Sequence, residues 1–221
     1  MRKVVTKNEI KKYFFDGMSL MVGGFMGCGT PEGLVDLVLE LGIKDITLIA
    51  TDTATTERGV GRLIAAKRIK KLYASHIGLN PETGRQMHDG TIEVELVPQG
   101  SLAEKIRAGG FGLGGILTPT GIGTVVEEGK QIIEVDGVKF ILEKPLKADV
   151  SLIRGSTTDF YGNVIYGGTS NNFNQVMATA GNIVIVETEK LVPAGSLNKE
   201  SIHTQSIFVD YIIKGGGSNV Y

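Results

Sequence analysis

The chain contains a single cysteine, Cys28, and only three histidines. One cysteine excludes an internal disulfide and any metal site that needs several thiolates. The histidines, His76, His88 and His203, do not follow a metal-binding spacing. We therefore expect no metal ion in the functional site.

Long apolar runs and an excess of either charge are also absent from the sequence. The 23 basic and 24 acidic side chains give a formal net charge of -1, which leaves no broad basic surface for nucleic acid or an anionic membrane. No run approaches the length of a membrane-spanning helix, and charged residues interrupt the N-terminal segment, where a secretory signal would be apolar. We expect a soluble cytoplasmic protein.

Strand-like and helix-like segments alternate through most of the chain. With 221 residues and 42% hydrophobic content, the sequence is expected to form one domain, with a mobile tail at 215–221. Strands are expected at 20–22, 46–50, 71–75, 92–97, 149–154, 183–187 and 207–213, and helices at about 6–14, 31–41, 58–67, 81–89, 101–108 and 173–180. This alternation predicts an α/β fold with an open, mainly parallel sheet flanked by helices.

Two neighbouring segments interrupt that alternation. The apolar runs at 131–135 and 138–142 are separated by Asp136-Gly137, which predicts an antiparallel hairpin insertion with a two-residue turn. The preceding segment, 110–123, contains six glycines, too many for a regular element and too apolar for a flexible linker. We expect it to line a ligand, with Gly114 and Gly115 as candidate substrate contacts.

The most informative segment is 16–31, where a short apolar run leads into closely spaced glycines and then into a helix. Glycine permits backbone angles and a close ligand approach that a Cβ forbids. The pattern places Thr30 at the N-cap and Pro31 at the first helical position, with the first N–H groups of the helix facing the glycines. Such a helix start favours a phosphate, a carboxylate or a developing oxyanion.

This segment resembles the first signature of the family I coenzyme A transferases. The signature consists of Asp-Gly, two free positions, three apolar residues, Gly-Gly-Phe, three free positions, Gly, one free position and Pro. Its fixed positions are filled by Asp16, Gly17, Gly23, Gly24, Phe25, Gly29 and Pro31. Further similarity to the alpha subunit of that family runs through 80–85, 97–100, 118–124, 127–130, 162–163 and 172–174. The resemblance implies the CoA-transferase-like fold.

The resemblance also implies an activity, which is the exchange of CoA between a short-chain acyl-CoA and a free acid of the acetate, butyrate or acetoacetate class. In that family a glutamate attacks the acyl-CoA, and the reaction passes through an acyl anhydride and an enzyme–CoA thioester with ping-pong kinetics. Coenzyme A is then a substrate, and no tightly bound cofactor is implied.

The nucleophilic glutamate of the family lies in a Ser-Glu-Asn-Gly motif of the beta subunit, and this sequence has no such motif. The nearest pairing, Glu127-Glu128-Gly129, lies beside the expected hairpin without the neighbouring residues, so we interpret it as structural. The resemblance therefore implies half of an active site. A beta subunit carrying the motif would complete it, in an α2β2 or α4β4 assembly.

Acyl exchange needs fixed backbone donors, because each tetrahedral intermediate places negative charge on a carbonyl oxygen. Gly24 and Phe25 are the candidates for this oxyanion hole. The residues expected to contact CoA are Gly23, Gly24, Phe25, Met26, Gly27, Cys28 and Gly29. Within this loop we interpret Cys28 as a small packing residue rather than a nucleophile. Replacing Gly24 with valine is expected to block the loop while leaving folding intact.

Candidate contacts to the acyl substrate come from the ends of two expected strands. Gln99 follows the strand at 92–97 and matches a family position that contacts the acyl group. Asp52 and Thr53 follow the strand at 46–50 in a similar geometric position. Ligands of open α/β sheets bind beyond the carboxyl ends of the strands, where all three residues are expected.

Two other interpretations remain open at this point. A dinucleotide-binding module is suggested by the glycine spacing of 27–33 and by Asp52 at the end of the next strand, but Pro31 interrupts that fingerprint and Gly-Gly-Phe has no place in it. A non-catalytic scaffold for a partner enzyme would explain the missing glutamate. It would not explain the glycine loop or Gln99.

Overall fold

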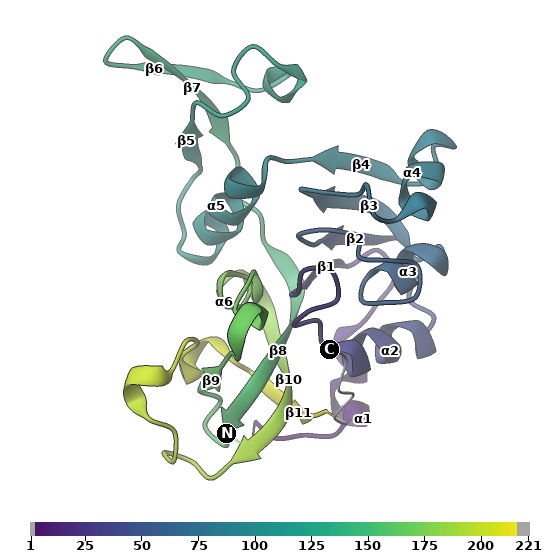
Figure 1. The fold of residues 1–221 in the computed structure, drawn as a ribbon, viewed down its shortest axis with the longest axis vertical. Coiled ribbons are helices and arrows are strands. Elements are labelled where there is room, and N and C mark those ends of the chain that lie inside the picture. Colours follow the sequence, from purple (N-terminus) through teal and green to yellow (C-terminus); the bar gives the residue numbers. More distant parts are fainter. Residues whose placement is uncertain (1–2, 216–221) are drawn as a thin grey trace.

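A mainly parallel sheet runs through the centre of the protein in the computed structural model, which describes residues 3–215 (Figure 1). The strands lie in the order β11, β10, β8, β1, β2, β3, β4, each parallel to its neighbours, and β9 pairs antiparallel with β8. They are β1 (Ser19–Val22), β2 (Ile46–Ile49), β3 (Ile69–Ala74), β4 (Glu93–Leu96), β8 (Ala148–Asp159), β9 (Val164–Ile165), β10 (Gly181–Val192) and β11 (Tyr211–Lys214). The predicted open, mainly parallel sheet is confirmed.

Helices cover both faces of this sheet, and an apolar cluster fills the space on each side. Leu34 of one helix packs in the first cluster and Leu102 of another in the second. Along β1, Leu20 and Val22 belong to the first cluster and Met21 to the second, as the two-residue period of a strand requires. The helices are α1 (Lys7–Ile10), α2 (Glu32–Glu40), α3 (Gly61–Ala65), α4 (Pro81–His88), α5 (Gln99–Gly110) and α6 (Asn174–Met177). No helix within residues 3–215 is long and apolar enough to cross a membrane.

Several element boundaries differ from those that the sequence predicts. Strands β8 and β10 run far beyond 149–154 and 183–187, because their backbones stay paired where the apolar alternation has stopped. Helices α3 and α6 are shorter than predicted. Tight turns precede α3, where the N–H of Arg58 donates to Thr55 O and that of Gly61 to Arg58 O. A 3₁₀ turn at Ser206–Phe208 delays the start of β11. Residues 216–221 of the expected tail lie outside the described residues.

A second, antiparallel sheet forms an arm that projects from the parallel sheet (Figure 1). The arm consists of β5 (Ile116–Thr118), β6 (Ile132–Val135) and β7 (Val138–Glu143), in the order β5, β7, β6. The predicted hairpin turn is confirmed, since Asp136 and Gly137 have φ of 53° and 77°. The expectation of no regular element within 110–123 was wrong, because β5 pairs with the edge of β7.

One face of the arm is apolar and partly exposed. Residues that pair across an antiparallel ladder lie on the same face. By the register of the three strands, this face consists of Leu117, Ile133, Val135, Val138, Phe140 and Leu142, and in the described chain it carries no charged side chain. Val138 is 51% exposed, and Leu117 and Val135 are each 42% exposed. We call this set the apolar arm face.

Candidate active site

The glycine segment after β1 forms a tight, hydrogen-bonded turn. The N–H of Phe25 donates to the carbonyl of Cys28 (3.0 Å), and the N–H of Cys28 donates to that of Phe25 (2.8 Å). The two residues at the tip, Met26 and Gly27, have φ of 53° and 80°, as in a type I′ turn. A positive φ is uncommon for methionine. Here the Met26 N–H is held by both carboxylate oxygens of Asp52, at 3.1 and 3.2 Å.

The other glycines of the loop are needed for packing within the chain itself. A Cβ on Gly23 would lie 1.9 Å from Oδ1 of Asn174, and one on Gly24 would lie 2.1 Å from Oγ1 of Thr30. A Cβ on Gly29 would lie 2.9 Å from Ser170. The glycines thus let the loop pack closely against Asn174 of α6, against Ser170 before that helix, and against Thr30.

Most backbone donors of the loop already have acceptors in the protein. Besides the three N–H groups of Phe25, Met26 and Cys28, that of Gly23 donates to Leu152 O (2.9 Å) and that of Gly24 to Oδ1 of Asn172 (3.2 Å). The candidate oxyanion donors Gly24 and Phe25 are therefore engaged. Among the described residues, no acceptor is bonded to the N–H groups of Gly27 and Gly29.

The start of α2 differs from the predicted anion site. The helix begins at Glu32, and Pro31 rather than Thr30 occupies the N-cap position. The N–H groups of Gly33 and Leu34 donate to the buried carboxylate of Glu187, with 2.8 Å for Leu34. The helix start therefore holds a carboxylate, as such sites favour, but one from the chain itself. Burial raises the pKa of Glu187 despite these two donors.

A cavity of about 940 Å³ opens beside the tip of the glycine loop. Met26, Gly27, Cys28 and Gly29 form one wall, so both unpaired amides belong to residues that line it. Its remaining walls come from α2 and α3 with the segment between them, from β8 and β10, and from 167–170.

Most charges around this cavity are paired with one another. Arg62 contacts Glu32 at 2.7 Å and also contacts Asp36, and Arg154 contacts Glu189 at 2.7 Å. Among the described residues that line the cavity, Glu57 and Arg58 form no ion pair, so the Arg58 guanidinium is a charged donor beside the neutral, fixed backbone amides. The thiol of Cys28 is exposed, with its Sγ 3.1 Å from Oγ1 of Thr169.

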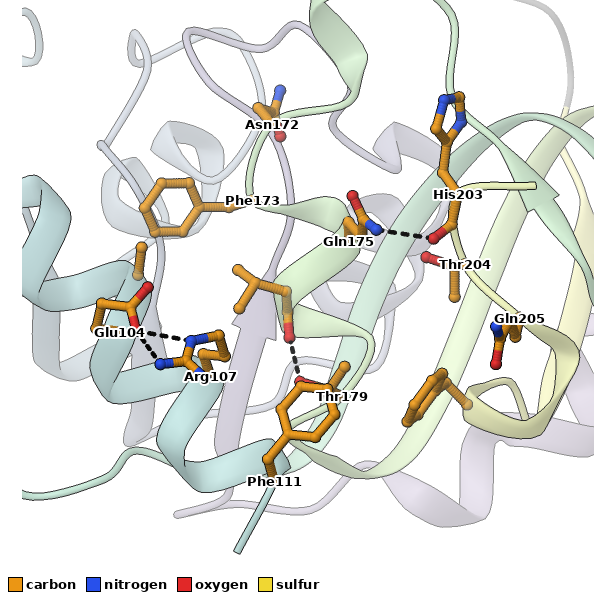
Figure 2. A pocket seen from close by; sticks show the side chains of 13 residues that line it. Glu104, Arg107, Phe111, Asn172, Phe173, Gln175, Thr179, His203, Thr204 and Gln205 are labelled. Atoms are coloured by element: carbon orange, nitrogen blue, oxygen red, sulfur yellow. Dashed lines mark hydrogen bonds and ion pairs between the residues drawn. The ribbon is translucent and has the colours of Figure 1, made fainter. Parts of the chain in front are cut away.

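A second cavity of about 590 Å³ lies between α5, α6 and residues 203–208 (Figure 2). Figure 2 shows Asn172 and Phe173 at one end of it and Phe111 at the other. The pair Glu104–Arg107 on α5 lines it on one side, and the bond from Gln175 to the carbonyl of His203 (2.8 Å) crosses between α6 and the segment at 203–208. Asn172 thus lies where this cavity meets the glycine loop.

The remaining predicted site residues fall into two groups. Asp52 and Thr53 are buried beside the loop, where Asp52 also accepts from the Ala54 N–H at 2.9 Å. Gln99 is the exposed first residue of α5 rather than part of a loop after β4. Gly114 and Gly115 precede β5 at the base of the arm, and neither they nor Gln99 lines either of the two cavities described above.

Sequence reasoning missed three side chains that hold the loop and α2, namely Asn172, Asn174 and Glu187. The two asparagines lie in one of the segments that carry the family resemblance, and this was the available signal. Glu187 closes a predicted strand, and its distance in sequence from α2 gave no indication of contact.

Comparison with known proteins gives a consistent result. The family model for coenzyme A transferase matches residues 5–215. The acetate CoA-transferase subunit alpha of Escherichia coli is 52% identical over 211 residues, covering 96% of each chain. The acetoacetyl-CoA:acetate/butyrate CoA transferase alpha subunit of Clostridium acetobutylicum is 49% identical over 212 residues, covering 96% of this chain and 97% of that one.

Solved structures share the fold at lower sequence identity. An acyl-CoA transferase of Escherichia coli in a thioester complex with CoA matches with a TM-score of 0.85 and 23% identity, covering 100% of this chain and 48% of that one. Glutaconate coenzyme A-transferase of Acidaminococcus fermentans matches with a TM-score of 0.83 and 20% identity, covering 96% of this chain and 75% of that one.

Proposed function

Because the chain belongs to the coenzyme A transferase family and is the alpha subunit of an enzyme that moves CoA between an acyl-CoA and a free acid, we propose that its acids are short. Acetate, butyrate and acetoacetate are the proposed class, as in the names of the two alpha-subunit relatives. The structural observation that supports CoA exchange at this site is the glycine loop, which places on the wall of a large cavity two residues whose N–H groups have no acceptor within residues 3–215. Those donors suit the oxyanion of a thioester under attack.

The proposed reaction divides the chemistry between two subunits. A glutamate of the beta subunit, in a Ser-Glu-Asn-Gly motif, attacks the thioester carbonyl, and the C–S bond breaks to give an acyl anhydride and free CoA thiolate. The thiolate then attacks the glutamyl carbonyl of the anhydride, which releases the first acid and leaves an enzyme–CoA thioester. The acceptor acid repeats these steps in reverse. Gly27 and Gly29 are the donors best placed to stabilise the oxyanions, in the loop that also contains Gly24 and Phe25.

The other candidate residues take different places in this proposal. Asp52 acts through the loop, because its carboxylate holds the Met26 N–H, and Thr53 lies buried beside it. Gln99, Gly114 and Gly115 contact the acyl group from outside the cavity, on the side that the beta subunit completes. The assembly is α2β2 or α4β4.

Because the beta subunit supplies the nucleophile and this chain supplies the backbone donors, CoA-transferase activity is expected only when the two subunits are mixed. Exchange from acetyl-CoA to a panel of short acids is measured with this chain, with its beta subunit, and with both together. We expect initial-velocity patterns of a ping-pong reaction from the mixture alone. Activity of this chain by itself would place the nucleophile here, with the exposed Glu57 on the cavity wall as the first candidate. Full activity of the beta subunit alone would make this chain a scaffold, whereas saturable NAD binding without a CoA effect would favour the dinucleotide module.

The apolar arm face is the surface that we assign to the beta subunit. The apolar side chains of this face are partly exposed, and exposed apolar patches of this kind mark protein–protein interfaces. The face carries no charge in the described chain, so burying it needs no compensating ion pair. The heteromeric enzyme supplies an obligatory partner to cover it.

Replacing Val138 with aspartate is expected to weaken association with the beta subunit by at least about tenfold, because an unpaired carboxylate would be buried in the interface. Titration calorimetry of the two subunits measures the change. The matched control is Val125→Asp, since Val125 is 78% exposed and lies outside the apolar arm face. Unchanged affinity of Val138→Asp together with loss of self-association would assign the face to a second copy of this chain.

A further inference from the structure

The side chain of Asn172 bonds to both sides of the glycine turn. Its Oδ1 accepts from the Gly24 N–H at 3.2 Å, and its Nδ2 donates to the carbonyl of Cys28 at 3.1 Å. The same Nδ2 donates to Thr169 O at 3.0 Å, which ties the turn to the segment before α6. One amide group therefore connects the entry of the turn, its exit and the neighbouring segment.

A second asparagine, Asn174, bonds both to the glycine loop and to Asn172. Asn174 is fully buried, and its Nδ2 donates to the carbonyl of Gly29 (2.9 Å) and to Oδ1 of Asn172 (3.3 Å). Its Oδ1 accepts from the N–H of Arg154 on β8 (3.0 Å). Asn174 also occupies the space that a Cβ of Gly23 would need. The central sheet thus fixes Asn174, which in turn orients Asn172.

From these contacts we infer that Asn172 is a positioning residue of the exchange reaction, which acts by holding the glycine loop in the shape that presents the Gly27 and Gly29 amides. The inference rests on the proposed function, in which this loop stabilises the oxyanion. Four glycines within seven residues give the loop many alternative conformations. Donors stabilise a developing charge well only when they are oriented before it forms.

Asn172 is a better position for a test than Asn174. Asn172 is partly exposed and lies at the end of the second cavity, so its substitution does not open the core (Figure 2). Asn171, the adjacent residue, provides a matched control. It is exposed, and within the described chain its side chain makes no hydrogen bond.

The first experiment is steady-state kinetics of the mixed subunits. Asn172→Ala is expected to lower kcat on the order of 10- to 100-fold and to change the KM for the acyl-CoA by less than about threefold, since the lost orientation matters chiefly in the transition state. Asn171→Ala is expected to match the wild type. A wild-type kcat for Asn172→Ala overturns the inference.

Asn172→Asp supplies a second test. Because aspartate is nearly isosteric with asparagine, this variant can be measured even if Asn172→Ala does not fold. The ionised aspartate can accept from Gly24 but places an oxygen against the Cys28 and Thr169 carbonyls. An aspartate with its usual pKa of about 3.9 stays ionised at pH 7 and cannot donate to either carbonyl, so we expect the kcat of this variant to be at least as low as that of Asn172→Ala. A wild-type kcat for Asn172→Asp at pH 7 would contradict the role of Nδ2 as a donor.

The alkylation rate of the single thiol, Cys28, measures how firmly the loop is held and does not depend on catalysis. In the full chain, Asn172→Ala is expected to raise the rate of Cys28 alkylation several-fold, because Cys28 loses the hydrogen bond to its carbonyl. An unchanged alkylation rate overturns the inference even if kcat falls. If Asn172→Ala alkylates faster but keeps a wild-type kcat, Asn172 holds the loop but the loop does not act in the exchange reaction. That result would overturn the part of the proposed function that rests on the loop.

Discussion

Alanine at position 24 is expected to lower the kcat of the assembled enzyme on the order of a hundredfold or more. Gly24 has a φ of +119°, which residues with a Cβ rarely adopt, and the added methyl would lie 2.1 Å from Oγ1 of Thr30. The backbone must therefore shift, and the N–H groups of Gly27 and Gly29 shift with it. Steady-state kinetics with the beta subunit present measures the loss.

The same change also affects folding, contrary to what the sequence predicts for Gly24→Val. Thr30 is buried and lies immediately before Pro31 and α2, so the clash reaches the start of that helix. We expect Gly24→Ala to lower the free energy of unfolding by about 1–3 kcal/mol. Urea denaturation of the full chain measures it.

Gly84→Ala is the matched control for this substitution. Gly84 is exposed within α4, and no described atom would lie within 4 Å of its added Cβ apart from its own helix and chain neighbours. Alanine is the better helix former, so the variant is expected to gain about 0.5–1 kcal/mol and to keep its kcat. Wild-type kcat and stability in Gly24→Ala would show that the loop is not held as described.

The fold was largely predictable from the sequence because burial on both sheet faces leaves a clear apolar pattern. The run Leu20-Met21-Val22 is apolar throughout, since its alternate residues pack in two different clusters. The ends of β8 and β10 were not predictable, because their backbone pairing continues where the apolar pattern stops. Beyond Glu187, β10 continues through the buried Thr188 and then through Glu189 and Lys190, two exposed charged residues that interrupt the apolar pattern although the backbone pairing persists.

The site was predictable only in part, for a related reason. Glycine spacing identifies positions that need unusual backbone angles or close packing, and Gly24, Gly27 and Gly29 all have positive φ. It does not reveal which groups satisfy the backbone donors. Those acceptors, Asn172 and Asp52, come from distant segments brought together by the sheet, so only tertiary structure shows which amides remain unpaired.

A buried ion-pair network at the base of the arm is the basis of the last prediction. Glu143 of β7 is 1% exposed and contacts Lys105 of α5 at 2.8 Å and Lys130 at 2.5 Å. Lys105 is itself buried and lies 3.7 Å from Glu95. The network therefore links the arm to α5 and, through Glu95, to the edge of the parallel sheet.

Replacing Lys105 with methionine is expected to destabilise the chain by about 3–5 kcal/mol, because it leaves a buried carboxylate with one of its two cationic partners. Urea denaturation of the full chain at pH 7 measures the change. Arg107→Met is the matched control on the same helix. Its pair with Glu104 is about half exposed, so we expect an effect of at most about 1 kcal/mol.

The pH dependence separates loss of this charge interaction from loss of packing. Burial by itself raises the pKa of Glu143, but hydrogen bonds from Lys105 and Lys130 outweigh it and hold the pKa below its usual value. A carboxyl with a lowered folded pKa stabilises the fold above its unfolded pKa of about 4.3, and this contribution is lost as the pH falls through the folded pKa. Without Lys105 the folded pKa rises, so the deficit of Lys105→Met should shrink from pH 7 to pH 3.5. If the loss of unfolding free energy stays constant over this range, it comes from packing of the lysine stem and not from the charge. In that case, adding Glu143→Gln to Lys105→Met would recover no stability at pH 7.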